Sequence, residues 1–271
     1  MPEIAEVRTV KRALDSKILG LKIVDIIYRY DNIIKSNKDE FKKVLIGKTF
    51  NKISTNGKWL IFDLGEYGFV SHLRMEGKYN YIKSDIPYDK HEHIIFKLDN
   101  GYDLRYKDVR KFGIMSLVKT KDASLYSEIA KLGIEPDSDK LTKEYIYNHI
   151  QSNKHIKELL LDQSIINGLG NIYVDEVLFA SKIDPRRLGK DVTIEECDLI
   201  RKACFDIISK ATIYKGTTIR SYTSELGVIG EYQNYLKVHT KVGKPCEVCG
   251  STIIKIRVGG RGTYLCPKCQ K

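Results

Sequence analysis

The chain has 271 residues, of which 42% are hydrophobic and 30% charged, and its formal net charge is +11. This length suits one large domain or two modest ones. Because no run approaches the ~18 apolar residues of a membrane span, and no signal-peptide segment is visible, we expect a cytoplasmic protein that does not associate with membranes.

The first residues, Met1-Pro2-Glu3, are followed by a second carboxylate at Glu6. An initiator methionine is usually removed before proline, so we expect a free secondary amine on Pro2. An α-amino group titrates near pH ~8, which leaves a useful neutral, nucleophilic fraction at physiological pH. Such an amine can attack a sugar C1′ to give an iminium, with a neighbouring glutamate moving the proton. On these residues alone, capping of a helix is the alternative.

Apolar residues recur at helical spacing after this stretch and predict an N-terminal helix that ends near Gly20. Residues 21–119 then predict many short strands, which suggests a two-layer β-sandwich. Turn-forming sequences at 65–68 and 99–101 stand where hairpins are expected. The expected strands are Leu21–Tyr30, Phe50–Ser54, Trp59–Leu64, Phe69–Leu73 and His91–Leu98.

A polar, proline-bearing stretch at residues 134–141 predicts a linker. We therefore expect an α+β chain with a sandwich domain over 1–133 and a helical domain over 142–240. Within the helical part, the glycines of Gly168-Leu169-Gly170-Asn171 precede a helix and would let backbone amides approach a DNA phosphate. A plain helix-connecting loop is the alternative.

The last part of the chain, residues 241–271, carries two Cys-x2-Cys pairs separated by sixteen residues. This spacing is typical of a four-thiolate structural zinc site, with two disulfides as the alternative. The expected ligands are Cys246, Cys249, Cys266 and Cys269. Cys197 and Cys204 are expected to be buried thiols without a function.

Positive charge is concentrated at the same end. Residues 236–271 hold eight Lys or Arg against one Glu, which is +7 of the chain's +11. This favours a polyanionic partner such as nucleic acid, with a merely solubilising tail as the alternative. The sequence shows no glycine-rich phosphate loop of either nucleotide-binding type, so we expect no nucleotide cofactor.

Six ordered blocks of the chain, taken together, are similar to the formamidopyrimidine-DNA glycosylase family of bacterial base-excision repair enzymes, which is related to the endonuclease VIII branch. The resemblance implies a β-sandwich, a helix–two-turn–helix domain and a zinc-finger hairpin. The chain departs from the family pattern at two positions: Ala5 stands where the family commonly has proline, and Arg8 stands where an acidic residue is frequent. The blocks are Met1–Glu3 with Glu6, Gly57-Lys58, His72–Gly77, Arg110–Gly113, Gly168–Tyr173, and the four-cysteine end with Arg261.

The resemblance implies catalytic roles for Pro2, Glu3, Glu6 and Lys58. Pro2 would be the nucleophile that displaces the damaged base and forms a Schiff base with the deoxyribose. Glu3 would act as the acid/base and Glu6 as a supporting carboxylate. Lys58, together with Asn171, would belong to a grip on the phosphates of the lesion strand.

The resemblance also implies the other DNA contacts. Arg261 at the finger tip would complete the phosphate grip, and His91 would be a further DNA contact. Met75, Arg110 and Phe112 would fill the space left by a base rotated out of the helix, and wedges of this kind unstack duplex DNA. Without the family, Met75 and Phe112 would be expected in the core.

A loop over residues 216–239 is similar to the family's segment that closes over an extruded purine. A mobile surface loop would have the same composition. The residues expected to border the base pocket are Glu76, Arg220, Ser221, Tyr222 and Thr223.

The resemblance as a whole implies a bifunctional DNA glycosylase/AP lyase that excises 8-oxoguanine and formamidopyrimidines and then carries out β,δ-elimination. Its partner would be double-stranded DNA with oxidised or abasic sites, its metal one structural Zn²⁺, and its state a monomer in a bacterial cytoplasm. Two alternatives stay open: an endonuclease VIII-like enzyme for oxidised pyrimidines, and a zinc-bearing DNA-binding protein without activity.

Overall fold

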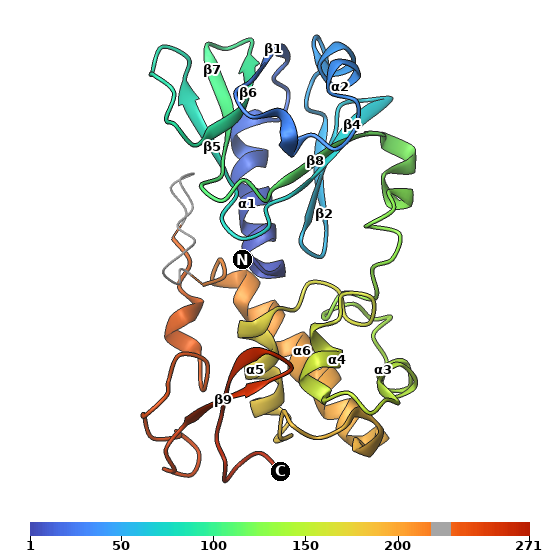
Figure 1. Cartoon of the computed structure of the whole chain (residues 1–271), viewed down its shortest axis with the longest axis vertical. Coiled ribbons are helices and arrows are strands. Elements are labelled where there is room, and N and C mark those ends of the chain that lie inside the picture. The colour runs from blue at the N-terminus through green and yellow to red at the C-terminus, as the bar shows by residue number, and fades with distance from the viewer. Residues whose placement is uncertain (218–228) are drawn as a thin grey trace. The chain divides into compact units, whose positions relative to one another are not determined.

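The computed structural model describes residues 1–217 and 229–271 and divides the chain into two compact units. The first unit comprises Met1–Ala130 and Thr217–Gly230, and the second comprises Lys131–Gly216 and Glu231–Lys271 (Figure 1). The chain therefore returns to the first unit once before it completes the second. No helix among the described residues is long and apolar enough to cross a membrane.

The first unit begins with helix α1, Ile4–Ile18, as the sequence predicts. Its apolar face is buried and packs against strands β2, Lys52–Asn56, and β3, Trp59–Asp63. Glu3 is the N-cap, and Glu3 and Glu6 form a reciprocal capping box. Gly20, with φ +82°, follows the helix in the left-handed conformation that commonly ends helices. The interpretation of Glu3 and Glu6 as helix-capping residues is thus confirmed. Capping does not exclude a chemical role for the same carboxylates.

Two four-stranded antiparallel sheets form most of the rest of the first unit. One has the strand order β1-β6-β7-β5 and the other β2-β3-β4-β8 (Figure 1). The strands are β1 Ile23–Tyr28, β2 Lys52–Asn56, β3 Trp59–Asp63, β4 Tyr67–His72, β5 Lys78–Lys83, β6 Glu92–Leu98, β7 Tyr102–Lys107 and β8 Ile114–Lys119.

The two sheets share one core, in which aromatic rings bridge the layers. Phe69 of β4 stacks on Phe62 of its own sheet at 4.3 Å and on Phe96 of the other sheet at 5.3 Å between ring centroids. Offset aromatic pairs of this kind contribute beyond the area they bury. The predicted two-layer sandwich is therefore confirmed.

Helix α2, Lys38–Leu45, was not predicted, because only strands were expected in this part of the chain. Asn37 caps it by accepting hydrogen bonds from the backbone of Asp39 and Glu40. Only Phe41 and Leu45 of its eight residues are buried, which is too few to show a helical period in the sequence. Strands β5 and β7 also escaped individual prediction because charged and polar residues interrupt their apolar pattern. Strand β8, in which Ser116 is the only polar residue before Lys119, was not predicted individually either.

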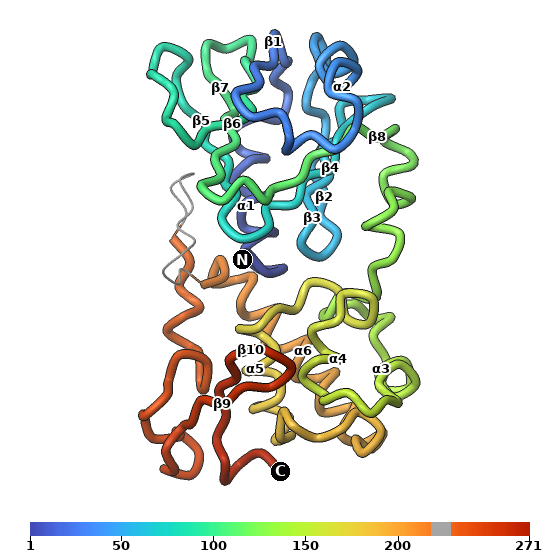
Figure 2. The backbone as a smooth tube through the Cα atoms, in the orientation of Figure 1, coloured from blue at the N-terminus to red at the C-terminus, as the bar shows by residue number. Residues whose placement is uncertain are grey.

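The second unit is built from helices that end in a hairpin, as expected. Helix α6 packs against α3 and α5, and the β9–β10 hairpin lies against α5 (Figure 2). The elements are α3 Lys143–Ile150, α4 Ile156–Leu161, α5 Asn171–Ala180, α6 Ile194–Ile213, β9 Ile254–Val258 and β10 Arg261–Leu265. Short 3-10 helices lie at η1 Asp31–Ile33, η2 Thr120–Leu125, η3 Gly189–Asp191 and η4 Tyr232–Tyr235, of which the first two belong to the first unit.

Candidate active site and DNA interface

The start of the chain brings an amine and several charged side chains together in the first unit. Met1 is 41% exposed, whereas Glu3, Glu6 and Lys58 are 3%, 4% and 5% exposed. Burial lowers the pKa of the terminal amine, here on Met1, because it disfavours the charged form. The carboxylates of Glu3 and Glu6 oppose this shift, and Lys58 adds to it. The site therefore favours a neutral, nucleophilic amine more than open solvent does.

Glu6 holds this region together through both of its carboxylate oxygens. The Glu3 backbone N–H donates to Glu6 Oε2 at 3.0 Å. Glu6 Oε1 accepts from the backbone N–H of Thr217 at 2.6 Å and from its hydroxyl at 3.0 Å. Thr217 was not predicted, since 211 positions separate it from Glu6 and nothing in the sequence signals the pairing. The geometry suits Glu6 to positioning rather than to proton transfer.

Two loops of the first unit present apolar side chains at the surface. Met75 is 38% exposed and Phe112 is 54% exposed, so the alternative drawn from residue type alone, that they are core residues, is wrong. The Arg110 guanidinium lies 4.8 Å from the centroid of the Phe112 ring, within range of a cation–π interaction. Exposed large apolar side chains beside a cation are suited to insertion between bases.

His91 and Glu76 lie on the first unit and are both partly exposed. The His91 backbone N–H donates to Asp89 Oδ1 at 2.8 Å, which fixes the turn before β6. The charge of Glu76 raises the pKa of the terminal amine, although it is the weakest of the resolved influences. Glu76 therefore lies near enough to the amine to affect it.

In the second unit, Asn171 and the finger hairpin are joined directly. Asn171 is the first residue of α5, and its Nδ2 donates to the backbone carbonyl of Gly262 at 2.9 Å. Arg261, the residue before Gly262, begins β10 and is exposed. Two of the three residues expected to hold phosphates, Asn171 and Arg261, are thus linked through the Gly262 carbonyl within this unit.

A buried ionic network beneath that surface was not predicted. Lys157 is fully buried, and its Nζ donates to Asp175 Oδ1 at 2.6 Å, to Thr263 Oγ1 at 2.8 Å and to the Gly262 carbonyl at 3.2 Å. Asp175 Oδ2 lies 2.8 Å from His239 Nδ1. These bonds tie α4, α5 and the hairpin together, so they determine where Asn171 and Arg261 lie.

The four terminal cysteines form a cluster whose sulfur atoms all lie within 4.8 Å of one another. Cys246 and Cys269 are 3.9 Å apart and Cys249 and Cys266 are 3.4 Å apart between sulfurs. A tetrahedral zinc with Zn–S bonds of ~2.3 Å requires sulfur separations of about 3.8 Å, whereas a disulfide requires ~2.05 Å. The residues therefore fit zinc, and the disulfide alternative is wrong.

Sequence comparison gives matches along the chain to three domain families. The formamidopyrimidine-DNA glycosylase N-terminal domain matches residues 1–115, the H2TH domain of the same enzymes matches 132–223, and a zinc finger found in FPG and IleRS matches 243–271. A formamidopyrimidine-DNA glycosylase from Bacillus cereus is 44% identical over 273 residues, covering 100% of this chain and 99% of the relative. The Streptococcus mutans enzyme is 43% identical and covers 100% of both chains.

The chain belongs to the formamidopyrimidine-DNA glycosylase family.

Solved structures of the family have the same fold. A Lactococcus lactis FPG mutant in complex with Fapy-dG-containing DNA has a TM-score of 0.94 at 40% identity, over 100% of both chains. The L. lactis enzyme with abasic-site DNA has a TM-score of 0.93 at 40% identity, over 99% of both chains. A third complex of that enzyme, with oxidised-pyrimidine DNA, has a TM-score of 0.93 at 40% identity, over 100% of both chains. The resemblance stated from sequence motifs is thereby confirmed, as is the zinc-finger end.

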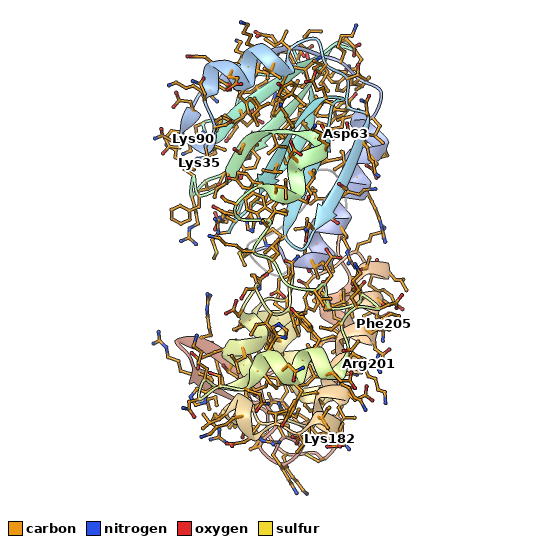
Figure 3. The ribbon with its side chains drawn as sticks, turned by 90° about the vertical axis from the view of Figure 1, so that its right-hand side faces the viewer. Lys35, Asp63, Lys90, Lys182, Arg201 and Phe205 are labelled. Atoms are coloured by element: carbon orange, nitrogen blue, oxygen red, sulfur yellow. The ribbon has the colours of Figure 1, made fainter. Side chains whose placement is uncertain are left out.

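Arg220, Ser221, Tyr222 and Thr223 of the expected base pocket lie outside the described residues. A hollow of about 510 Å³ in the second unit is bordered by residues 136–144 and by α6, whose labelled Arg201 and Phe205 can be followed in Figure 3. None of the residues that line this hollow is an expected site residue.

Proposed function

We propose that this protein is a DNA glycosylase and AP lyase that removes oxidised purines from duplex DNA. The observation that carries the proposal is the buried start of the chain, where Pro2 lies with the nearly buried side chains of Glu3, Glu6 and Lys58. Burial lowers the pKa of the terminal amine at this place, which in this structure belongs to Met1. It occurs in a chain that matches family members over its full length. An unprotonated amine beside a carboxylate is the arrangement that iminium chemistry requires.

The proposed reaction begins once Met1 has been removed. The Pro2 nitrogen attacks C1′ of the damaged nucleotide, the C1′–base bond breaks, and Glu3 transfers the proton that opens the sugar ring. The resulting iminium acidifies C2′–H, so loss of that proton expels the 3′ phosphate. A second elimination expels the 5′ phosphate, and hydrolysis then frees Pro2. Glu6 keeps the amine in place through its bonds to Glu3 and Thr217.

DNA binding in this proposal combines phosphate contacts with a wedge. Lys58, Asn171 and Arg261 hold phosphates of the lesion strand, with His91 as a further contact. These contacts help offset the few kcal/mol that extrusion of a nucleotide costs. Met75, Arg110 and Phe112 fill the vacated space, while Glu76 and the four residues of the 220–223 segment border the base. Zinc, bound by four thiolates, supplies no open coordination position and is structural.

The experiment that tests this proposal uses abasic DNA and sodium borohydride, which reduces an iminium to a stable amine. Wild-type protein is expected to give a covalent adduct. Protein that binds the same duplex without any adduct would instead be the zinc-bearing DNA-binding protein.

The rival specificity, for oxidised pyrimidines, is supported by one finding: the L. lactis relative was solved with an oxidised-pyrimidine DNA. Excision from duplexes that carry 8-oxoguanine or an oxidised thymine at the same position separates the two. We expect faster release of 8-oxoguanine, and the reverse order would favour the endonuclease VIII-like specificity.

We also propose that the enzyme acts as a monomer in a bacterial cytoplasm and needs no nucleotide cofactor. The sequence has no glycine-rich phosphate loop, which supports the absence of a nucleotide cofactor. Light scattering of the purified protein tests the monomer, and activity in nucleotide-free buffer tests the cofactor requirement.

A further inference from the structure

Two loops of the first unit carry the exposed side chains that the proposed function assigns to the vacated space in DNA. The first, Leu73–Gly77, connects β4 to β5 and carries Met75. The second, Asp108–Gly113, connects β7 to β8 and carries Arg110 and Phe112. A wedge built from two loops works only if both keep a defined spacing.

Each loop contains a strained residue that its surroundings must hold. Arg74 in the first loop has φ 52° and Lys111 in the second has φ 59°. Non-glycine residues in this left-handed region are strained and persist only where the neighbouring structure supports them. The two loops therefore hold a defined backbone conformation.

Buried side chains provide that support within each loop. His72 Nδ1 accepts a hydrogen bond from the Arg74 backbone N–H at 3.0 Å. Burial, together with the charges of Arg74 and Lys58, lowers the pKa of His72 to about 3, so the ring is neutral and keeps its acceptor. In the second loop, Asp108 accepts from the backbone N–H groups of Arg110 at 3.0 Å and Gly113 at 2.8 Å.

Tyr106 of β7, which is fully buried, lies between the two loops. A β-carbon on Gly77 would lie 2.1 Å from the Tyr106 hydroxyl oxygen, and one on Gly113 would lie 1.7 Å from the same atom. Neither glycine has a φ in the left-handed region, so the backbone conformation does not itself require glycine there. At Gly113 the Tyr106 ring and hydroxyl alone exclude a side chain, and at Gly77 the hydroxyl does so together with the Leu73 carbonyl, which would lie 2.6 Å from the β-carbon.

We infer that Tyr106 is a positioning residue for the reaction, whose hydroxyl sets the spacing between the Met75 loop and the Arg110–Phe112 loop so that both enter the duplex as one wedge. The inference rests on the proposed function, because it assumes that these loops insert into DNA. Tyr106 itself touches neither the substrate nor the amine in this account.

The test compares Tyr106→Phe with Tyr79→Phe. Tyr79 is an equally buried tyrosine in the same core, and its ring centroid lies 5.2 Å from that of Tyr106. Its hydroxyl donates to Ser71 Oγ at 2.8 Å, so this variant loses a hydroxyl that does not separate the two loops. Wedge insertion is followed by the fluorescence of 2-aminopurine beside an abasic analogue in duplex DNA. Chemistry is followed by single-turnover excision of 8-oxoguanine from a duplex and by borohydride trapping on single-stranded abasic DNA.

We expect Tyr106→Phe to slow the fluorescence change and duplex excision about tenfold, because small displacements of positioning groups cost one to two orders of magnitude. Trapping on single-stranded abasic DNA, which needs no wedge, is expected to match wild type. Tyr79→Phe is expected to match wild type in every assay. A second variant, Gly113→Ala, is expected to slow insertion as well, since the three nearest neighbours of its new β-carbon would all be Tyr106 atoms.

Three results would overturn the inference: an unchanged fluorescence rate in Tyr106→Phe, an equal loss in Tyr79→Phe, or an equal loss on single-stranded DNA. Failure of the proposed function has a different signature, namely a wild-type protein that gives no borohydride adduct. The fluorescence assay needs no catalysis, so it decides the inference in that case too.

Discussion

Replacement of Lys157 by methionine tests whether the buried network places the phosphate grip. The substitution keeps an apolar side chain of similar length but removes the ammonium group. Asp175, itself fully buried in its side chain, then loses its 2.6 Å ion pair and keeps His239 Nδ1 and the Tyr264 backbone N–H as neighbours. Removal of one partner from a buried ion pair typically costs about 3–5 kcal/mol, which is a large share of the ~5–15 kcal/mol that stabilises a domain.

The two units offer separate signals for this measurement. Trp59, the only tryptophan of the chain, lies in β3 of the first unit, whereas helices α3 to α6 belong to the second. We expect urea unfolding of zinc-loaded Lys157→Met to show an early loss of helical circular dichroism. The Trp59 fluorescence transition is expected to stay near its wild-type midpoint. Affinity for abasic-analogue DNA should also fall, because Lys157 and Asn171 share the Gly262 carbonyl.

Lys202→Met is the matched control in the same unit. Its ammonium pairs with Asp198 at 2.7 Å on the exposed side of α6, where such pairs contribute little. We expect its unfolding and its DNA affinity to match wild type. If Lys157→Met lost no more stability and no more affinity than this control, the network would have no part in holding the grip.

Three further substitutions probe other parts of the molecule. Pro2→Gly is expected to slow the lyase step at least about tenfold, equal to ~1.4 kcal/mol of barrier, with little change in DNA affinity; a parallel loss of affinity would argue against a nucleophilic role. Cys266→Ser should release zinc, unfold the finger and abolish DNA binding, so normal affinity of a zinc-free preparation would contradict the structural role of the metal. The buried His72, whose pKa is lowered to about 3, stays neutral while the unfolded chain takes up a proton below its ordinary pKa of 6.5, so stability falls as the pH drops from 6.5 towards 3. At pH 5 this loss is about 2 kcal/mol of unfolding free energy. Unfolding followed by Trp59 fluorescence should show that the stability of His72→Gln depends less on pH than that of wild type. An equal dependence in both proteins would refute the assignment of His72 as a buried, neutral ring.

The elements that the sequence predicted correctly are those with a clear local pattern of apolar residues, turn residues or cysteines. The first helix has a continuous apolar stripe and ends before Gly20, and the cysteine pairs have a spacing that few other sites share. The predicted hairpin turn at 99–101 lies between the paired strands β6 and β7, and the one at 65–68 joins β3 to β4 and runs into the first two residues of β4. In contrast, α2 buries only two side chains and leaves no visible period.

Contacts between distant segments left no such signal. The bond from Glu6 to Thr217 spans 211 positions, and the Lys157–Thr263 bond spans 106. Lys157 would be expected at the surface from its residue type, but the structure buries it completely because Asp175 pairs with it. Similarly, nothing in the sequence indicates that Gly77 and Gly113 must lack a side chain. This requirement is visible only in the structure, where the Tyr106 hydroxyl on β7 lies against both loops.

Location of the covalent adduct tests the central claim most directly. Wild-type protein is trapped on abasic DNA with borohydride, the complex is digested, and mass spectrometry identifies the peptide that carries the sugar fragment. We predict the fragment on the amino group of Pro2, in a peptide that lacks Met1 and contains Glu3 and Glu6. An adduct on a lysine side chain such as Lys58, or on any peptide away from the start of the chain, would contradict the account.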